Sequence, residues 1–141
     1  MKTINCLTRS AGTIVGAEHF VTDGTRVLLR VTRCRACGSS WFPARAQCSN
    51  CASWDLAAEL TSDEGTAYAS TVVRVGPRQY SAPYTLAYVD VDDVRLLAHA
   101  ASKEVLPPGT PVDLVLAPIG TADDGPVMSY AVTVKPAGGA R

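Results

Sequence analysis

The pattern of apolar and polar positions predicts a chain built almost entirely from short β-strands. Residues 66–75 alternate, with Tyr68, Ser70, Val72 and Arg74 on one side and Ala67, Ala69, Thr71, Val73 and Val75 on the other. A period of two is typical of a strand that buries one face. Four further strand-like runs follow at 85–91, 95–100, 112–116 and 127–134. The acidic turn Asp92-Asp93 joins the second run to the third, and residues 122–125 form the last turn.

These five runs occupy about 75 residues and predict a small closed barrel. The OB-fold is the five-stranded candidate, and a small sandwich is the alternative that periodicity does not separate from it. Upstream, residues 19–22 and 25–31 flank Asp23-Gly24, which predicts a β-hairpin. Residues 53–59 are expected to form a short linker or a single helical turn.

Two Cys-x-x-Cys pairs stand close together ahead of the predicted barrel. Cys34-x-x-Cys37 and Cys48-x-x-Cys51 are separated by ten residues. Two such turns facing each other place four thiolates in a tetrahedron, which suits Zn²⁺ and leaves no open position for catalysis. Gly38 directly follows the first pair, where a metal knuckle often needs a positive φ. The spacing therefore predicts a rubredoxin-like zinc ribbon with one structural Zn²⁺ per chain.

Other uses of these cysteines fit less well. Two disulfides need an oxidising compartment, and residues 1–5 are not followed by the apolar segment of a signal peptide. A redox Cys-x-x-Cys usually occurs as one pair near a βαβ unit. An iron–sulfur site shares the geometry, but no other feature suggests electron transfer. Cys6 has no partner and is expected to be a buried or incidental thiol.

Composition narrows the class of protein. The chain has 141 residues, 47% of them apolar and 18% charged, which is typical of a globular protein. No run approaches the roughly 18 apolar residues of a membrane span, so no membrane partner and a cytoplasmic location are expected. Between Thr25 and Trp54 there are five arginines and no acid, whereas from Thr61 onward nine acids outnumber six basic residues. A neutral chain with an acidic body is a poor general nucleic-acid binder.

The predicted organisation follows from these patterns. Residues 1–24 form an extension to which we assign no structure, 25–59 the zinc ribbon, 60–136 the OB-fold and 137–141 a disordered tail. The fold class is therefore mainly β, with a ribbon followed by a five-stranded barrel.

An ordered set of motifs between Leu29 and Val134 resembles the zinc-ribbon/OB-fold acyl-CoA-associated proteins, a family long labelled a domain of unknown function. The motifs are Cys34-x-x-Cys37-Gly38, Phe42-Pro43-x-Arg45, Cys48-x-x-Cys51, Gly65-x-x-Tyr68-x-Ser70-x-Val72, Gly76-Pro77, Pro83-Tyr84-x-x-Ala87-Tyr88-Val89-Asp90, Arg95-Leu96-Leu97-Ala98 and Gly109-x-Pro111-Val112. The cysteine pairs alone are unspecific, but the combination in this order is much more specific. Family members often begin with a helix before the ribbon, whereas residues 11–31 are predicted here to be β-structure.

The resemblance implies a function in lipid metabolism. Members of the family are small companions of thiolase-superfamily enzymes, namely thiolases, acyltransferases and aldolases that shorten steroid-type side chains. Some bridge enzymes or help to hold coenzyme A, and the catalytic cysteine and histidines belong to the partner. The expectation is an accessory subunit of a hetero-oligomer that acts on acyl-CoA.

The residues themselves agree with a role without catalysis. The chain has two histidines, His19 and His99, and His99 lies in an apolar run where a packed side chain is expected. The carboxylates of Asp90, Asp92 and Asp93 are expected to form a solvated turn, because an acid/base pair needs a pocket. No phosphate loop or nucleophile elbow is present in the sequence.

Candidate ligand contacts are basic and aromatic. Arginine guanidinium groups bind phosphates in a bidentate manner, so Arg45, Arg74 and Arg78 are candidates for coenzyme A, with Tyr80 and Tyr84 beside them. Solvent-exposed arginines and tyrosines at the barrel rim are the equally weighted alternative. The connecting segment 76–84 is long for a hairpin, and we expect it to face the coenzyme or the partner.

The ribbon carries its own aromatic pair. Trp41 and Phe42, with Pro43, lie between the two cysteine pairs. Such side chains usually pack over a small metal site, and the alternative is that they bind the partner. Two rival functions stay open, a single-stranded nucleic-acid-binding ribbon/OB module and a stand-alone acyl-CoA carrier or transferase.

Overall fold

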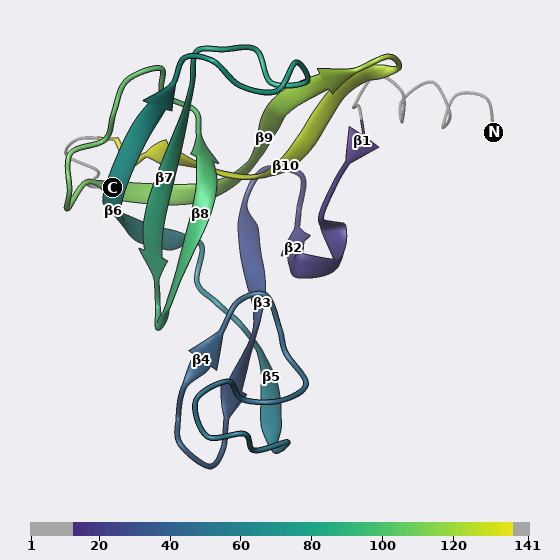
Figure 1. Ribbon diagram of the computed structural model, residues 1–141, viewed down its shortest axis with the longest axis vertical. Helices are drawn as coiled ribbons and strands as arrows, with labels where there is room; N and C mark the ends of the chain where they lie inside the picture. The colour runs from purple at the N-terminus through teal and green to yellow at the C-terminus, as the bar shows by residue number, and fades with distance from the viewer. Residues whose placement is uncertain (1–12, 137–141) are drawn as a thin grey trace.

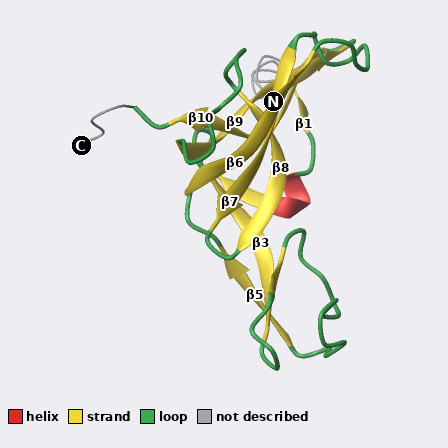
Figure 2. Ribbon diagram, turned by 60° about the vertical axis from the view of Figure 1, so that its left-hand side comes forward, coloured by secondary structure: helices red, strands yellow, loops and turns green. Residues whose placement is uncertain are grey.

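The computed structural model describes residues 13–136, and within that range the chain consists of β-strands, loops and one short 3-10 helix (Figures 1 and 2). The predictions for residues 1–12 and for the tail 137–141 lie outside the described residues. The elements are β1 (Thr13–Ile14), η1 (Ala17–His19), β2 (Phe20–Thr22), β3 (Val27–Cys34), β4 (Ser40–Trp41), β5 (Leu56–Leu60), β6 (Glu64–Val73), β7 (Tyr84–Val91), β8 (Val94–Ala100), β9 (Pro111–Ala122) and β10 (Gly125–Val134). None of the helical residues in this range forms a segment that could cross a membrane.

Strands β6 to β10 close into a five-stranded barrel in the order β6-β7-β8-β10-β9, with β9 pairing back onto β6. All neighbouring pairs are antiparallel except β8 and β10, which run parallel. A sheet that returns to its first strand has no free edge, which rules out an open sandwich. The predicted OB-type barrel is thus confirmed, and β1 adds a short parallel strand to the outer end of β10.

The predicted face assignment of the first barrel strand is wrong beyond its start. Ala67 pairs with Val89 and Ala69 with Tyr88, so Tyr68 is an extra residue in a β-bulge. A bulge shifts the alternation by one position, because two residues then oppose one. Ala67 faces the core, and after the bulge Ser70 lies opposite the buried Ala87, on the inner side.

The ribbon is organised around β3. β2 pairs with the first half of β3, which confirms the hairpin predicted about Asp23-Gly24. β4 and β5 both pair with its second half. The linker or helical turn predicted at 53–59 is therefore wrong, since residues 56–60 form β5. The edge of β3 that faces β5 has backbone N–H and C=O groups that need partners. Pairing with them makes Leu56–Leu60 a strand, although its sequence alone does not favour one.

β3 also belongs to the barrel core. Val27, Leu29 and Val31 are buried and pack in one cluster with barrel residues such as Leu114. Cys34, one of the predicted metal ligands, is the last residue of the same strand, which runs from the barrel into the ribbon (Figure 1). One continuous strand thus connects the barrel core to the cysteine cluster.

Two further contacts seat the ribbon against the barrel. On one side, Phe42 packs edge-to-face on Tyr130, with ring centroids 5.7 Å apart. On the other, the β7–β8 turn contacts the ribbon and the connection 61–63 between β5 and β6: Arg33 Nη2 lies 3.0 Å from Asp93 Oδ2, and the Ser62 N–H donates to Asp92 over 3.0 Å. The acidic turn is exposed, as predicted, and it is also bonded to β3 and to this connection.

A charged cluster closes the barrel beside the start of β3. Asp113 is 11% exposed and lies 3.3 Å from Arg26 Nη2 and 3.0 Å from Lys135 Nζ. Arg26 also contacts Asp63 at 2.9 Å, and Lys135 contacts Glu64 at 2.9 Å. The charged form of a carboxylate this buried is stabilised by its two cations, because burial has removed most of its hydration.

Removal of the Asp113 carboxylate should destabilise the protein. We expect Asp113→Ala to lower the free energy of unfolding by about 2 kcal/mol, because two partly buried cations lose their shared acceptor. Asp93→Ala is the control: its carboxylate is 63% exposed, and exposed ion pairs contribute little. Urea denaturation followed by circular dichroism measures both. Equal effects would show that the Asp113 cluster is no more important than a surface pair.

A candidate metal centre and a candidate ligand cavity

The four cysteines predicted as metal ligands lie together at the far end of the ribbon. All four Sγ atoms are within 4.8 Å of one another, and the Cys34–Cys51 and Cys37–Cys48 sulfurs are 3.6 Å apart. A tetrahedron with Zn–S bonds of 2.3 Å has edges of about 3.8 Å. The described thiols are free rather than disulfide-bonded. Donor type, number and spacing therefore fit a four-sulfur metal site.

The two cysteine pairs form equivalent turns. The Gly38 N–H donates to the Cys34 carbonyl over 2.8 Å, and the Ala52 N–H donates to the Cys48 carbonyl over 2.9 Å. Gly38 has φ 82°, as predicted, and Ala52 has φ 68° at the same position of the second turn. A left-handed alanine is unfavourable, so the second turn carries strain that the first avoids.

Hydrogen-bond donors surround the sulfurs. Trp41 Nε1–H and the Asn50 backbone N–H donate to Cys48 Sγ over 3.4 and 3.3 Å. Ser39, together with Asn50, lowers the pKa of the Cys37 thiol to about 5. The Ser53 backbone N–H favours the Cys51 thiolate, but Cys34, burial and the other two cysteines together raise the pKa of Cys51 to about 12. Neighbouring thiolates oppose one another's ionisation, and a divalent cation relieves that repulsion.

The predicted aromatic pair of the ribbon is split between two uses. Trp41 lies over the cysteines through its bond to Cys48, and Arg45 covers its ring at 4.9 Å. Phe42 packs instead on Tyr130 of the barrel strand β10. Its ring centroid also lies 6.1 Å from that of His19 in η1. Pro43 is exposed.

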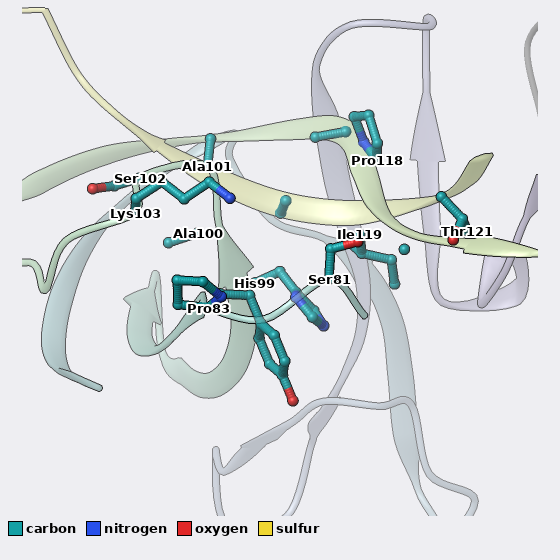
Figure 3. Close-up of a pocket in the computed structure, with 14 residues that line it drawn as sticks. Ser81, Pro83, His99, Ala100, Ala101, Ser102, Lys103, Pro118, Ile119 and Thr121 are labelled. Atoms are coloured by element: carbon teal, nitrogen blue, oxygen red, sulfur yellow. The ribbon is translucent and has the colours of Figure 1, made fainter. Parts of the chain in front are cut away.

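The second site is a cavity of about 370 Å³ at the end of the barrel opposite the ribbon (Figures 1 and 3). Four parts of the chain line it: the loop before β7 with the first residue of that strand, the end of β8 with the residues after it, the outer part of β9, and one residue of β10 (Figure 3). Its lining residues are Ser81, Pro83, Tyr84, His99, Ala100, Ala101, Ser102, Lys103, Ala117, Pro118, Ile119, Gly120, Thr121 and Ala131. Most of these are small or apolar, with a few polar groups among them, as in many small-molecule sites.

Three rings form a cluster at this cavity. Tyr80 and Tyr84 have centroids 5.5 Å apart, and His99 lies 5.0 Å from Tyr80 and 5.4 Å from Tyr84. Burial lowers the pKa of His99, which favours the neutral imidazole. His99 is thus packed, as predicted, and two of the predicted ligand residues are brought together beside it.

The predicted arginines are not all at one site. Arg74 and Arg78 lie in the exposed loop between β6 and β7, and neither pairs with an acidic side chain of the described residues. Arg45 lies in the ribbon, in the connection between β4 and β5, where it is bonded to Ser49 over 2.8 Å, and it is not among the residues that line the cavity. Lys103 lines the cavity and was missed, because only the barrel topology brings the end of β8 beside the outer part of β9.

The loop of the cavity is pinned to β9. The Thr121 N–H donates to the Gln79 carbonyl over 2.9 Å, and a Cβ on Gly120 would lie 2.4 Å from that same oxygen. Gly120 is therefore required by close backbone approach. The loop that carries Arg78 and Tyr80 is held in place rather than free.

The two cysteine turns should respond in opposite ways to exchange of glycine and alanine. Gly38→Ala should cost about 1 kcal/mol of ribbon stability, and Ala52→Gly should add up to about 1 kcal/mol, because both positions are left-handed. An added Cβ at Gly38 meets nothing within 4 Å, so the effect is purely conformational. Denaturation followed by tryptophan fluorescence reports on the ribbon, since Trp41 and Trp54 both lie there. Ala36→Gly, at a position without positive φ, is the control and should not stabilise.

Comparisons with family models and with known proteins agree on one family. Residues 29–57 match the model of the ChsH2 rubredoxin-like zinc ribbon domain, and residues 59–117 match that of the ChsH2 C-terminal OB-fold domain. The chain is 30% identical over 111 residues to benzoylsuccinyl-CoA thiolase subunit BbsA of Geobacter metallireducens, covering 77% of this chain and 75% of that protein. It is 29% identical to a DUF35 domain-containing scaffold protein of Methanocaldococcus jannaschii, covering 79% of this chain and 83% of that protein.

A solved structure shares the fold. The Ltp2-ChsH2(DUF35) aldolase matches with a TM-score of 0.55 and 23% identity, over 74% of this chain and 84% of that one. The ordered ribbon and barrel matches, with a relative at 30% identity over three quarters of its length, show that this chain belongs to the ChsH2 family of zinc-ribbon/OB-fold proteins.

Proposed function

We propose that this chain is a non-catalytic accessory subunit of a thiolase-superfamily enzyme that acts on acyl-CoA thioesters. The observation that carries the proposal is its relationship, over most of both chains, to a protein named as a thiolase subunit and to one named as a scaffold protein. The fold of an aldolase complex of this family is in line with it. The partner supplies the catalytic groups, and the two proteins form a hetero-oligomer.

The contacts of the three carboxylates at the β7–β8 turn support a role without catalysis. Asp90 is held by Arg95, with Oδ1 2.6 Å from Nε, and Asp92 and Asp93 bond to Ser62 and Arg33. Carboxylates tied up in this way at a surface turn are not free to exchange protons with a substrate.

Zinc is the metal that best suits the four-cysteine site. Four thiolates with donors from Trp41 and Asn50 fit a closed structural site, and no ligand position remains for water. The residues Cys34, Cys37, Cys48 and Cys51 would hold one Zn²⁺ per chain. Because Cys34 ends the strand that enters the barrel core, the metal fixes the ribbon's shape relative to the barrel.

The barrel cavity is the proposed place for the coenzyme A part of the substrate. Arg74, Arg78 and Lys103 bring three cations to one end of the barrel, and the apolar lining suits the uncharged arm of the coenzyme. Phosphates favour arginine and lysine, and the Tyr80–Tyr84 pair offers ring faces. Arg45 drops out of this proposal, because it lies in the ribbon.

The subunit proposal is tested by co-expression with thiolase-fold proteins of the same organism. We expect co-purification in a defined ratio with one zinc per chain, measured by size-exclusion chromatography and elemental analysis. Cys48→Ser should lose the zinc and the partner while the barrel stays folded by circular dichroism, because the ribbon depends on the metal. Cys6→Ser, outside the four-cysteine set, is the control. A chain that stays alone with every candidate, or a Cys48→Ser protein that keeps zinc and partner, would contradict the proposal.

Coenzyme A binding is tested on the purified complex by calorimetry. Arg78→Ala and Lys103→Ala should each weaken binding of coenzyme A roughly tenfold, because each removes one charged contact to phosphate. Arg30→Ala, on an exposed position of β3 at the ribbon, should change the affinity little. If the two variants bind as tightly as the unmodified complex, the cavity does not hold the coenzyme.

A further inference from the structure

The aromatic side chain that the ribbon leaves free is Trp54. Its exposed fraction is 71%, the highest of any aromatic residue among the described residues. Trp41 and Phe42 are used internally, by Cys48 and by Tyr130. Within residues 13–136, Trp54 takes part in no ring–ring contact and its indole N–H finds no acceptor. A tryptophan is rarely left in water in this way, and this one is available to a partner.

The backbone around Trp54 is fixed on both sides. The Cys48 N–H donates to the Ser53 carbonyl over 2.8 Å, and the Arg35 N–H donates to the Asp55 carbonyl over 2.9 Å. The Asp55 N–H also donates to Ser53 Oγ over 3.0 Å. These bonds tie the segment to both cysteine turns, so the position of Trp54 depends on the metal site. A side chain presented on a fixed backbone loses little entropy on binding.

The charges beside Trp54 cancel locally. Arg35 Nη1 and Asp55 Oδ1 form an ion pair at 2.7 Å, and Arg33 forms ion pairs with Glu59 and Asp93. Neutralised arginines do not make the electrostatic groove that accompanies base stacking in single-strand binders. The surroundings therefore fit an apolar pocket on a protein better than a nucleic acid.

The position of Trp54 separates it from the cavity. Leu56 pairs with Cys34 and Leu60 with Arg30, so β5 begins at the cysteine end and runs toward the barrel. Trp54 lies just before the start of β5, at the cysteine end of the ribbon, and Figure 1 shows the ribbon extending away from the barrel. A partner that binds Trp54 leaves the cavity open.

We propose that Trp54 docks the ribbon into an apolar pocket of the partner subunit. The inference rests on the proposed function, which supplies a protein partner, and it moves the docking role predicted for Trp41, Phe42 and Pro43 to a different side chain. Tryptophan is enriched among the few residues that carry most of the binding energy at interfaces.

The test uses the two tryptophans of the chain, Trp41 and Trp54. The full chain labelled with 5-fluorotryptophan should give two ¹⁹F resonances, assigned by loss of one in Trp54→Phe. Addition of an unlabelled thiolase-fold partner that co-purifies with the chain should shift or broaden the Trp54 resonance and leave that of Trp41 nearly unchanged. Removal of the metal by a chelator should move both.

Affinity supplies the second readout. Trp54→Ala should weaken association with the partner by roughly 30-fold or more, as for an interface hot spot, with the zinc content unchanged. Tyr88→Ala, an aromatic residue 49% exposed on the barrel, is the matched control and should bind normally.

The outcomes separate the two proposals. If the unmodified chain binds a thiolase-fold partner but Trp54→Ala binds equally well, the docking role is overturned and the proposed function stands. If no partner binds the unmodified chain, the proposed function is overturned. A Trp54 resonance that moves with the chain's own concentration, or with a single-stranded oligonucleotide, overturns the inference in favour of self-association or base stacking.

Discussion

The structure depends on one strand that serves two bodies. The first half of β3 buries Val27, Leu29 and Val31 in the barrel core, and its last residue, Cys34, belongs to the four-cysteine cluster that could hold a metal ion. A ribbon of this size has little apolar core of its own, so order in it would depend on both a bound metal and the barrel. Because the strand is continuous, the orientation of the cysteine turns relative to the barrel is fixed by backbone pairing as well as by side-chain contacts.

This arrangement puts the two candidate sites at opposite ends of the molecule. The cysteine turns and Trp54 lie at one end, and the cavity with Lys103, Tyr84 and His99 lies at the other. The continuous strand β3 and the contact of Phe42 with Tyr130 hold the ends in a set relation. Under the proposed function, one end would bind the partner and the other would hold the ligand, and neither task requires a reactive group of this chain.

Local strain and close approach occur at both ends. Ala52 is left-handed in the second cysteine turn, and Gly120 allows the Gln79 carbonyl to approach β9. The approach at Gly120 is set by a neighbour distant in sequence, whereas the turn at Ala52 is closed by bonds to residues close by in the chain. Backbone hydrogen bonds hold the loop over the cavity and the segment that carries Trp54, which favours binding with little loss of entropy.

The sequence by itself determined the four-cysteine set, the five barrel strands, the hairpin at Asp23-Gly24 and the family, because spacing and alternation are local properties. Only the tertiary structure decided that residues 56–60 form a strand, since the free edge of β3 outweighs their local preference. The same holds for the bulge at Tyr68, the separation of Arg45 from Tyr80 and Tyr84, and the place of Lys103 in the cavity. Each of these depends on which strands become neighbours when the barrel closes. The tertiary structure also decided which aromatic side chain of the ribbon stays exposed, because Trp41 bonds to Cys48 and Phe42 packs on Tyr130, which leaves Trp54 in solvent.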